Sequence, residues 1–282
     1  MMTETQTAAG TTRRQSAGNK PQDFKPMKLP RLRLPPLRAR VAFISAATLL
    51  TVWQIAAATG MINTGYFSSP FAVAQAAWEL VASGELGENA LITLFEFASG
   101  YSIAVAIGVP LGMLMGWRLR VRQTFEPLLI ALYVTPSLAL LPIFVLALGI
   151  GTASKIAIVF VEVLITVVVN TMAGIRETDP KLVQTARSFC ANDLDVFRKV
   201  LFPSAMPTMV AGLRLGVGRG VITVIVAELY GGIEGVGVMI SVYGQSFRIA
   251  ELLFLVFLVG LFGYTLSYVI STAERAVTPW RR

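Results

Sequence analysis

Six long apolar runs decide what this chain can fold into. Each is close to or above the ~20 residues that a helix needs to cross the hydrocarbon core of a bilayer. The runs are too continuous for the strands of a membrane barrel, which alternate in polarity over about ten residues. The sequence therefore predicts an all-α, polytopic membrane bundle of about six transmembrane helices. The runs cover roughly residues 41–60, 90–116, 125–148, 154–175, 205–230 and 251–272.

Kinks are expected within the second and third runs. Pro110, Pro136 and Pro142 lie inside them. Proline lacks a backbone N–H, and its ring clashes with the preceding turn of a helix. A bundle tolerates such kinks where neighbouring groups satisfy the freed backbone atoms.

Composition favours a membrane protein over one or two soluble domains of the same length. Of the 282 residues, 55% are apolar and 14% are charged, which is typical of a chain with several membrane spans. In such a protein a formal net charge of +8 indicates loops that face anionic lipid. No nucleic-acid partner is expected.

Several kinds of chemistry lack the residues that they need. The chain contains no histidine and one cysteine. A zinc site, histidine acid–base catalysis and a disulfide framework are therefore not expected. We predict no metal, no cofactor and no catalytic residue.

The two ends of the chain differ from the apolar middle. Residues 1–40 carry nine Lys or Arg and two acids, among many Ser, Thr, Gln and Pro, a composition that cannot bury a core. We predict a disordered basic cytoplasmic tail there, a transmembrane domain over 41–272, and a short cytoplasmic tail over 273–282. A cleaved signal peptide is not expected, because the first apolar run starts late and is about as long as a full span.

Lys and Arg are unevenly distributed between the loops. They are frequent in both tails, in the 117–123 turn and in the 176–204 loop, whereas loop 61–89 has none. Positive residues near the ends of spans mark the cytoplasmic side. We expect both termini and loop 176–204 in the cytoplasm, and loop 61–89 outside. A Ser-Ser-Pro sequence at 68–70 predicts an amphipathic helix that either packs over the bundle or contacts a delivery protein.

The long cytoplasmic loop is polar, and its pattern predicts two short helices. An Asp-Pro pair at 179–180 suits the N-cap and first position of a helix. Asn192 suits the cap of a second helix, with Asp195 near the positive helix end. We expect a break near Cys190 and a membrane helix that starts at Pro203. The spacing alone favours an ordinary solvated connection over a docking element for another protein.

The same loop resembles the EAA loop of bacterial ABC-importer permeases. That motif has Glu-Ala-Ala, a Gly four residues on, and a late Ile-x-Leu-Pro. Ala186 and Pro203 match it strictly. At the corresponding positions the chain has Gln184, Thr185, Ala186, Cys190, Val200, Phe202 and Pro203.

Neighbouring segments resemble the nitrate/sulfonate/taurine branch of these permeases. The resemblance covers roughly residues 41–272, and it is specific because the segments share their order and spacing with that branch. The segments are 111–116, 136–142, 186–188, 202–207, 212–216 and 227–228.

This resemblance implies a type I importer-permease fold and a non-catalytic transport subunit. Such a subunit forms the translocation path for a small, anionic or organic solute. The implied partners are ABC ATPase subunits, a second permease copy in a homodimer, an extracytoplasmic solute-binding protein and membrane lipid. The implied location is the bacterial inner membrane, with both termini in the cytoplasm.

In this family the helical pair docks into a groove of the ATPase subunit and transmits its motion to the spans. Gln184 replaces an acid that can pair with a cation of the partner, and Cys190 replaces the turn glycine. Because cysteine tolerates positive φ poorly, we expect the break to move to Ala191-Asn192. The resemblance assigns ATPase coupling to Gln184, Thr185, Ala186, Arg187, Cys190, Phe197, Val200, Phe202 and Pro203.

Five of the ionisable residues that fall within predicted spans are candidates for a role there. An ionised side chain at the bilayer centre costs ~2.5–3.5 kcal/mol on insertion scales, so such residues face a bundle interior or an aqueous path. Both roles stay open: pairing between helices, and lining the translocation path. On the fifth span neither Arg is placed to pair with the Glu of the same helix. The residues are Glu96, Glu162, Arg214, Arg219 and Glu228.

Glu162 is the deepest of these residues, within an otherwise apolar run. An ionised carboxylate has a high free energy in hydrocarbon, so Glu162 is expected to have a protonated state, a polar partner or an aqueous cavity. We favour a neutral hydrogen bond between helices, because a carboxylate in the path would repel the anionic solutes that the resemblance suggests.

Two other classes of function compete with the importer permease. A self-sufficient secondary transporter or channel would use the intramembrane acids as an ion relay, but no inverted repeat is detectable. An intramembrane enzyme would need a metal cluster or a nucleophile–base pair, which the sequence lacks. The chain also has no G-x-x-x-x-G-K-[ST] motif, so ATP hydrolysis is expected in a separate subunit. The resemblance leaves nitrate, sulfonates, taurine, bicarbonate and some vitamin precursors or aromatics open as substrates. A few pore-lining residues do not distinguish among these solutes, so specificity is expected to reside mainly in the binding protein.

Overall fold

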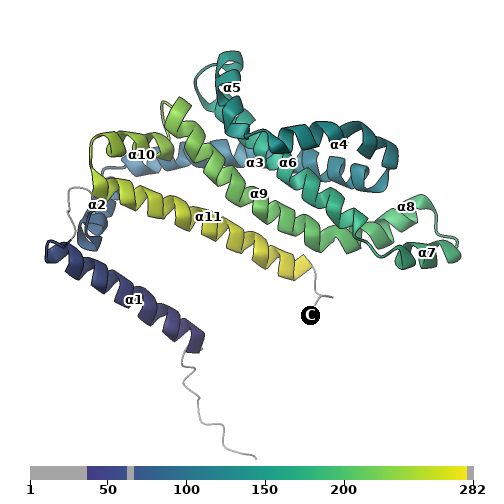
Figure 1. The fold of residues 1–282 in the computed structure, drawn as a ribbon, viewed down its shortest axis with the longest axis horizontal. Helices are drawn as coiled ribbons and strands as arrows, with labels where there is room; N and C mark the ends of the chain where they lie inside the picture. The colour runs from purple at the N-terminus through teal and green to yellow at the C-terminus, as the bar shows by residue number, and fades with distance from the viewer. Residues whose placement is uncertain (1–36, 62–66, 278–282) are drawn as a thin grey trace, which may run out of the picture. The chain divides into compact units, whose positions relative to one another are not determined.

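The computed structural model describes residues 37–61 and 67–277. Within these ranges every regular element is a helix, which confirms the all-α prediction (Figure 1). The chain divides into two compact units after Ala47, and the bundle described below belongs to the second. The elements are α1 (Leu37–Ala58), α2 (Pro70–Ala82), α3 (Glu85–Trp117), α4 (Leu119–Val134), the short 3-10 helix η1 (Ser137–Leu140), α5 (Leu141–Leu148), α6 (Thr152–Arg176), α7 (Pro180–Ser188), α8 (Asp193–Val196), the π-helical turn η2 (Phe197–Leu201), α9 (Phe202–Gly231), α10 (Val236–Gln245) and α11 (Ile249–Val277).

The two predicted tails lie mostly outside the described residues, at positions 1–36 and 278–282. α1 begins at Leu37 and α11 runs to Val277. Both helices therefore extend a few residues into the ranges predicted as tails.

Four helices of the described chain are long and apolar enough to cross a membrane. They confirm the predicted runs 90–116, 154–175, 205–230 and 251–272. The helices are α3, α6, the continuous helix Asp193–Gly231 that contains α9, and α11 as far as Thr272.

α1 corresponds to the first predicted run. A helix of 22 residues is about 33 Å long, enough to cross the hydrocarbon core. Its stretch Ile44–Ala58 taken alone is a shorter apolar helix. A span at this helix therefore stays a prediction.

The predicted run 125–148 is not a single kinked span. α4 is bent by 91° against the helical pair η1–α5. The backbone is extended at Thr135 and Pro136, because a residue before proline is disfavoured in the helical conformation. Pro142 lies in the first turn of α5, where its missing N–H costs no hydrogen bond. Counted as one broken span, the pair raises the number of candidate spans in the described chain to five.

α3 and α6 pack closely along a stripe of small residues. A Cβ built on Gly100 would lie 2.8 Å from a methyl carbon of Val159, and one on Gly116 would lie 2.6 Å from Ile175. Such close backbone approach is typical of helix pairs in membranes. Residues later in α3 contact residues later in α6, so the two helices run parallel. The stripe on α3 consists of Gly100, Ala104, Gly108, Gly112 and Gly116.

α9 packs against α6 in the opposite direction. A Cβ on Gly174 would lie 2.9 Å from the Ala205 carbonyl oxygen, and one on Gly220 would lie 2.9 Å from a methyl carbon of Val163. Residues later in α9 contact residues earlier in α6, so these helices are antiparallel. The core shared by α3, α6, α9 and α11 includes Phe97, Val163, Val167, Val217, Val221, Val224 and Leu255.

The bundle has two different ends (Figure 1). At one end α7 and α8 lie beside the last turns of α3 and α6, where Trp117 stacks on Phe197 with ring centroids 4.8 Å apart. At the other end lie α2, α10 and the first turns of α3. α7 and α8 of loop 176–204 and α2 of loop 61–89 therefore lie at opposite ends, which the predicted sidedness requires.

α2 is the amphipathic helix predicted after position 68. Its cap is Ser69, whose side chain accepts a hydrogen bond from the Ala72 N–H at 3.2 Å, and Pro70 is its first residue. Leu80 is buried and Trp78 is exposed. The helix contacts α11 and α3, as expected of a helix that packs over the bundle.

Candidate functional site

Residues 179–203 form the α7–α8 segment, and polar caps start both of its helices as predicted. The Asp179 carboxylate accepts a hydrogen bond from the Lys181 N–H at 2.8 Å, with Pro180 as the first helical residue. The Asn192 side chain accepts one from the Asp195 N–H at 2.8 Å. These caps satisfy N–H groups that the first turn of a helix leaves without partners.

Cys190 itself makes the break after α7, so the predicted shift to Ala191-Asn192 is wrong. Its φ of 57° lies in the left-handed region. The Cys190 N–H donates to the Arg187 carbonyl at 2.9 Å, and the Ala191 N–H donates to the Ala186 carbonyl at 3.1 Å. This Schellman pair of bonds satisfies carbonyls at the helix end. The bonds offset the conformational cost of a cysteine where glycine is usual.

The second helix of the segment continues into the membrane helix. α8, the π-helical turn and α9 form one continuous helix, so the prediction of a separate helix from Pro203 is wrong. Pro203 has no N–H to donate to the Lys199 carbonyl, and a wider turn just before it accommodates the proline ring. No loop separates α8 from α9, so a movement of α8 is passed directly to α9.

The apolar side of the α7–α8 segment is anchored on the bundle. Val196 and Leu201 are buried in one cluster with Ile175 of α6. Phe197 stacks on Trp117 at the end of α3. The segment is therefore attached to α3, α6 and α9 at once.

The opposite side of the α7–α8 segment is exposed. Phe189 is 83% exposed, and Leu182 and Leu194 are also exposed. A large aromatic next to the turn residue was the sequence signal for this surface. Of the residues assigned to coupling, Gln184, Thr185, Arg187 and Cys190 are exposed, whereas Ala186, Phe197, Val200, Phe202 and Pro203 are half-buried.

Asp193 at the start of α8 links this helix to α7 and to the end of α3. Its carboxylate pairs with Arg187 of α7 at 3.0 Å and with Arg118 at 3.4 Å. The Arg118 guanidinium also covers the Trp117 ring at 4.1 Å from its centroid. Exposed pairs of this kind contribute up to about 1 kcal/mol each, so their main effect is to fix the orientation of α7.

A buried polar cluster lies near the other end of the bundle, made of Asn89, Thr93, Glu96, Lys155 and Glu228. Glu96 of α3 and Lys155 of α6 are fully buried and form an ion pair at 2.7 Å. Glu96 was among the candidate residues, whereas Lys155, at the start of the predicted run 154–175, was not. A lone Lys at the head of an apolar run was the available signal.

Glu228 fixes the start of α10. Its carboxylate accepts hydrogen bonds from the Thr93 hydroxyl at 2.7 Å and from the Gly237 N–H at 2.7 Å. Asn89 accepts one from the Gly235 N–H at 2.7 Å. Lys155 also donates to the Glu234 carbonyl at 3.2 Å. The cluster therefore ties α3, α6 and α9 to the turn between α9 and α10.

Tyr243 provides a further link between α10 and the start of α3. Its hydroxyl donates to the Glu85 carboxylate at 3.3 Å. Burial raises the pKa of the Tyr243 hydroxyl above its ordinary value, so the group stays protonated and can donate. Arg248 covers the ring at 4.6 Å and pairs with Glu251 at 2.6 Å.

Glu162 and Arg219 form an ion pair between α6 and α9. Arg219 Nη1 lies 3.1 Å from Glu162 Oε1, and the Ser137 hydroxyl donates to Glu162 Oε2. The Arg219 guanidinium lies 5.7 Å from the centre of the Tyr133 ring. Arg214, the other cation of α9, donates to the Ser271 hydroxyl of α11 at 3.0 Å. Glu162 thus pairs between helices, but its partner Arg219 is a cation, so the neutral hydrogen bond favoured for Glu162 is wrong.

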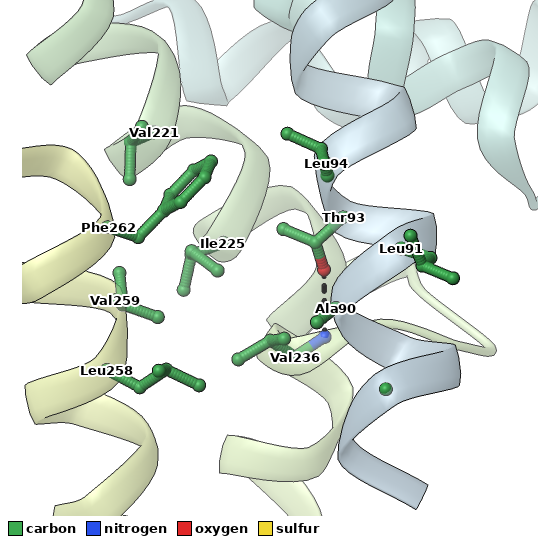
Figure 2. Close-up of a pocket in the computed structure, with 11 residues that line it drawn as sticks. Ala90, Leu91, Thr93, Leu94, Val221, Ile225, Val236, Leu258, Val259 and Phe262 are labelled. Carbon is green, nitrogen blue, oxygen red and sulfur yellow. Dashed lines mark hydrogen bonds between the residues drawn. The ribbon is translucent and has the colours of Figure 1, made fainter. Parts of the chain in front are cut away.

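An apolar pocket of about 440 Å³ lies between α3, α9 and α11 (Figure 2). Leu94, Ile225, Leu258 and Phe262 are among its lining residues. The Thr93 hydroxyl at its edge already accepts a hydrogen bond from the Val236 N–H at 2.9 Å. Because a polar solute would lose its hydration there without gaining partners, this pocket is not a solute site.

The comparisons with known proteins point to membrane transport. Residues 108–282 match the family described as "Binding-protein-dependent transport system inner membrane component". The chain is 27% identical over 239 residues to the taurine transport system permease protein TauC of Escherichia coli (strain K12), a match that covers 83% of this chain and 87% of the relative. It is 29% identical over 245 residues to the nitrate import permease protein NrtB of Synechocystis sp. (strain ATCC 27184 / PCC 6803 / Kazusa), with 84% and 88% covered.

The fold is similar to that of solved importer structures. A structure of the MetNI methionine ABC transporter in an inward-facing conformation contains a chain that matches with a TM-score of 0.62 at 20% identity. The match covers 68% of this chain and 96% of that chain. At this identity the match shows the fold alone.

Cys190→Gly is expected to stabilise the protein. Glycine adopts the left-handed conformation without the cost of about 1 kcal/mol that a side chain incurs there. The midpoint of thermal unfolding in detergent should rise. Ser188→Gly, inside the last turn of α7, should lower the midpoint, because it should reduce the free energy of unfolding by a similar amount. A lower midpoint for Cys190→Gly would contradict the observed break.

Lys155→Met is expected to destabilise the protein by about 3–5 kcal/mol, because it leaves the Glu96 carboxylate buried without its cation. The double variant Glu96→Met/Lys155→Met should recover most of that loss in thermal unfolding. As a control, Lys199→Met removes an exposed pair with Asp195 and should leave the midpoint of thermal unfolding nearly unchanged. Additive losses in the double variant would show that the buried pair is not coupled.

Proposed function

Because the chain belongs to the family of binding-protein-dependent transport system inner membrane components, we propose that it is the permease subunit of an ATP-driven importer. It is an ABC-transporter permease of the nitrate/sulfonate/taurine branch and a multi-pass inner-membrane protein. In the proposed complex, separate ATPase subunits hydrolyse ATP. This chain and a second copy of it form the path for a solute that an extracytoplasmic binding protein delivers.

The α7–α8 segment is the observation that carries this proposal. It exposes Phe189 and Leu182, and other residues of the segment anchor it to three helices. Exposed aromatic and aliphatic side chains on a rigid base suit a hydrophobic groove of a partner. Since α8 continues into α9, a partner that moves the segment also moves a helix that crosses the membrane.

The proposed solute is a small molecule with a sulfonate or other oxyanion group. This proposal is supported by the names of the similar proteins, which refer to taurine and nitrate. In this proposal the binding protein selects the solute, and the permease supplies a path that admits it.

The proposed sidedness places the α7–α8 segment and both termini in the cytoplasm of a bacterium. Support comes from the Lys and Arg residues near that end, including Arg118, Arg176 and Arg187. The binding protein then meets the opposite end, where α2 and α10 lie and where the buried polar cluster keeps the α9–α10 turn rigid.

Phe189→Asp is expected to weaken ATPase binding at least tenfold, because it places a charge in an apolar contact. The measurement is the amount of ATPase subunit retained per permease when the tagged, full-length chain is purified from membranes. Phe71→Asp is the matched control, since Phe71 is 73% exposed at the opposite end, and it should retain the ATPase subunit fully. Normal retention by Phe189→Asp, at normal membrane insertion, would count against the importer proposal.

A further inference from the structure

Arg219 lies on a strip of α9 that the rest of the described chain leaves uncovered. The residue is near the middle of the 30-residue helix. Leu215 and Ile222, about one turn to either side, are exposed. A Cβ built on Gly218 would meet nothing within 4 Å. The opposite side of α9 packs on α3 and α6, so this strip faces away from the bundle core.

The charge on this strip restricts what can face it. The side chain of Arg219 is 47% exposed. A guanidinium at that depth would cost several kcal/mol against lipid. The strip is therefore unsuited to hydrocarbon and suited to an aqueous path. Arg214 and Lys155, by contrast, are directed to Ser271 and Glu96 within the bundle.

In the ion pair between Glu162 and Arg219, the Arg219 guanidinium is the more exposed group. Glu162 is only 16% exposed, and its two oxygens are used by Arg219 and Ser137. Among the described residues, Arg219 makes its hydrogen bond through Nη1. An arginine has five N–H donors in a planar fork that matches sulfonate and other oxyanions. Several donors can therefore point into the space beside α9.

We propose that Arg219 is an anion-contact residue of the translocation path, where its outward N–H groups bind the oxyanion end of the solute. This proposal rests on the proposed transport function. Glu162 positions the guanidinium and offsets part of its charge, which keeps the affinity low. Weak binding suits a path, because a solute must leave the site as readily as it enters.

Charge-selective labelling beside Arg219 tests the proposal. Ile222→Cys is made in a Cys190→Gly chain, and the full-length protein is purified with its ATPase subunit into lipid nanodiscs. The probes are two methanethiosulfonates, one with a sulfonate group and one with a trimethylammonium group. The quantity measured is the ratio of the two labelling rates. Leu261→Cys on α11 is the matched control, since the two native side chains are 63% and 62% exposed.

The expected ratio depends on the charges near position 222. With Arg219 present the sulfonate reagent should be favoured, and Arg219→Gln should lower the ratio about tenfold. Arg219→Lys should keep most of the preference. Glu162→Gln should raise the ratio, because it removes the partially offsetting negative charge. Leu261→Cys should react slowly with both reagents, as expected of a side chain that faces lipid.

Two results would overturn the proposal. If Ile222→Cys reacts with neither reagent, the strip is covered by lipid or by a second copy of the chain. If it reacts but its ratio is the same with Arg219 and with Gln, the path is aqueous and Arg219 does not attract the anion. Retention of the ATPase subunit is recorded for each variant. Failure of the importer proposal would appear as loss of the ATPase subunit, whereas failure of the Arg219 proposal would appear in the ratio of labelling rates.

Discussion

The close approach of α3 and α6 is the contact on which the rest of the structure depends. A stripe of glycine and alanine on α3 lets the backbone of α6 come near enough for Val159 and Ile175 to fill the space. The last turns of the same two helices anchor the α7–α8 segment at one end. Their N-terminal halves provide Glu96 and Lys155 to the buried polar cluster at the other. One helix pair thus holds both candidate functional ends at a fixed separation.

The two ends are built for different tasks. In the buried cluster Glu96 pairs with Lys155, and Glu228 is held by Thr93 and by the Gly237 N–H. Such an arrangement suits a rigid anchor better than the ion relay that a secondary transporter would need. The α7–α8 segment has the opposite character, because Phe189 is left exposed. An exposed apolar surface that is joined to α9 without a loop suits the transfer of a partner's motion.

Long apolar runs predicted the spans well, because the bilayer imposes length and polarity on every crossing helix. The helix caps at Asp179 and Asn192 were also predictable, since they depend on neighbours in sequence. A kink at Pro136 and a break near Cys190 were predicted, but the 91° size of the bend and the left-handed conformation of Cys190 itself were not, because each depends on backbone bonds and packing that composition does not specify. The partners of Glu96 and Glu162 were missed for the same reason, since they lie on other helices.

The most direct test of the central claim is a photo-crosslink at the proposed contact with the ATPase. A benzophenone amino acid at position 189 of the full-length chain is irradiated in intact membranes, and the adducts are identified by mass spectrometry. The account predicts an adduct with the ATPase subunit from position 189 and none from position 71, at the opposite end of the bundle. The absence of an ATPase adduct at position 189, or equal yields at both positions, would contradict it.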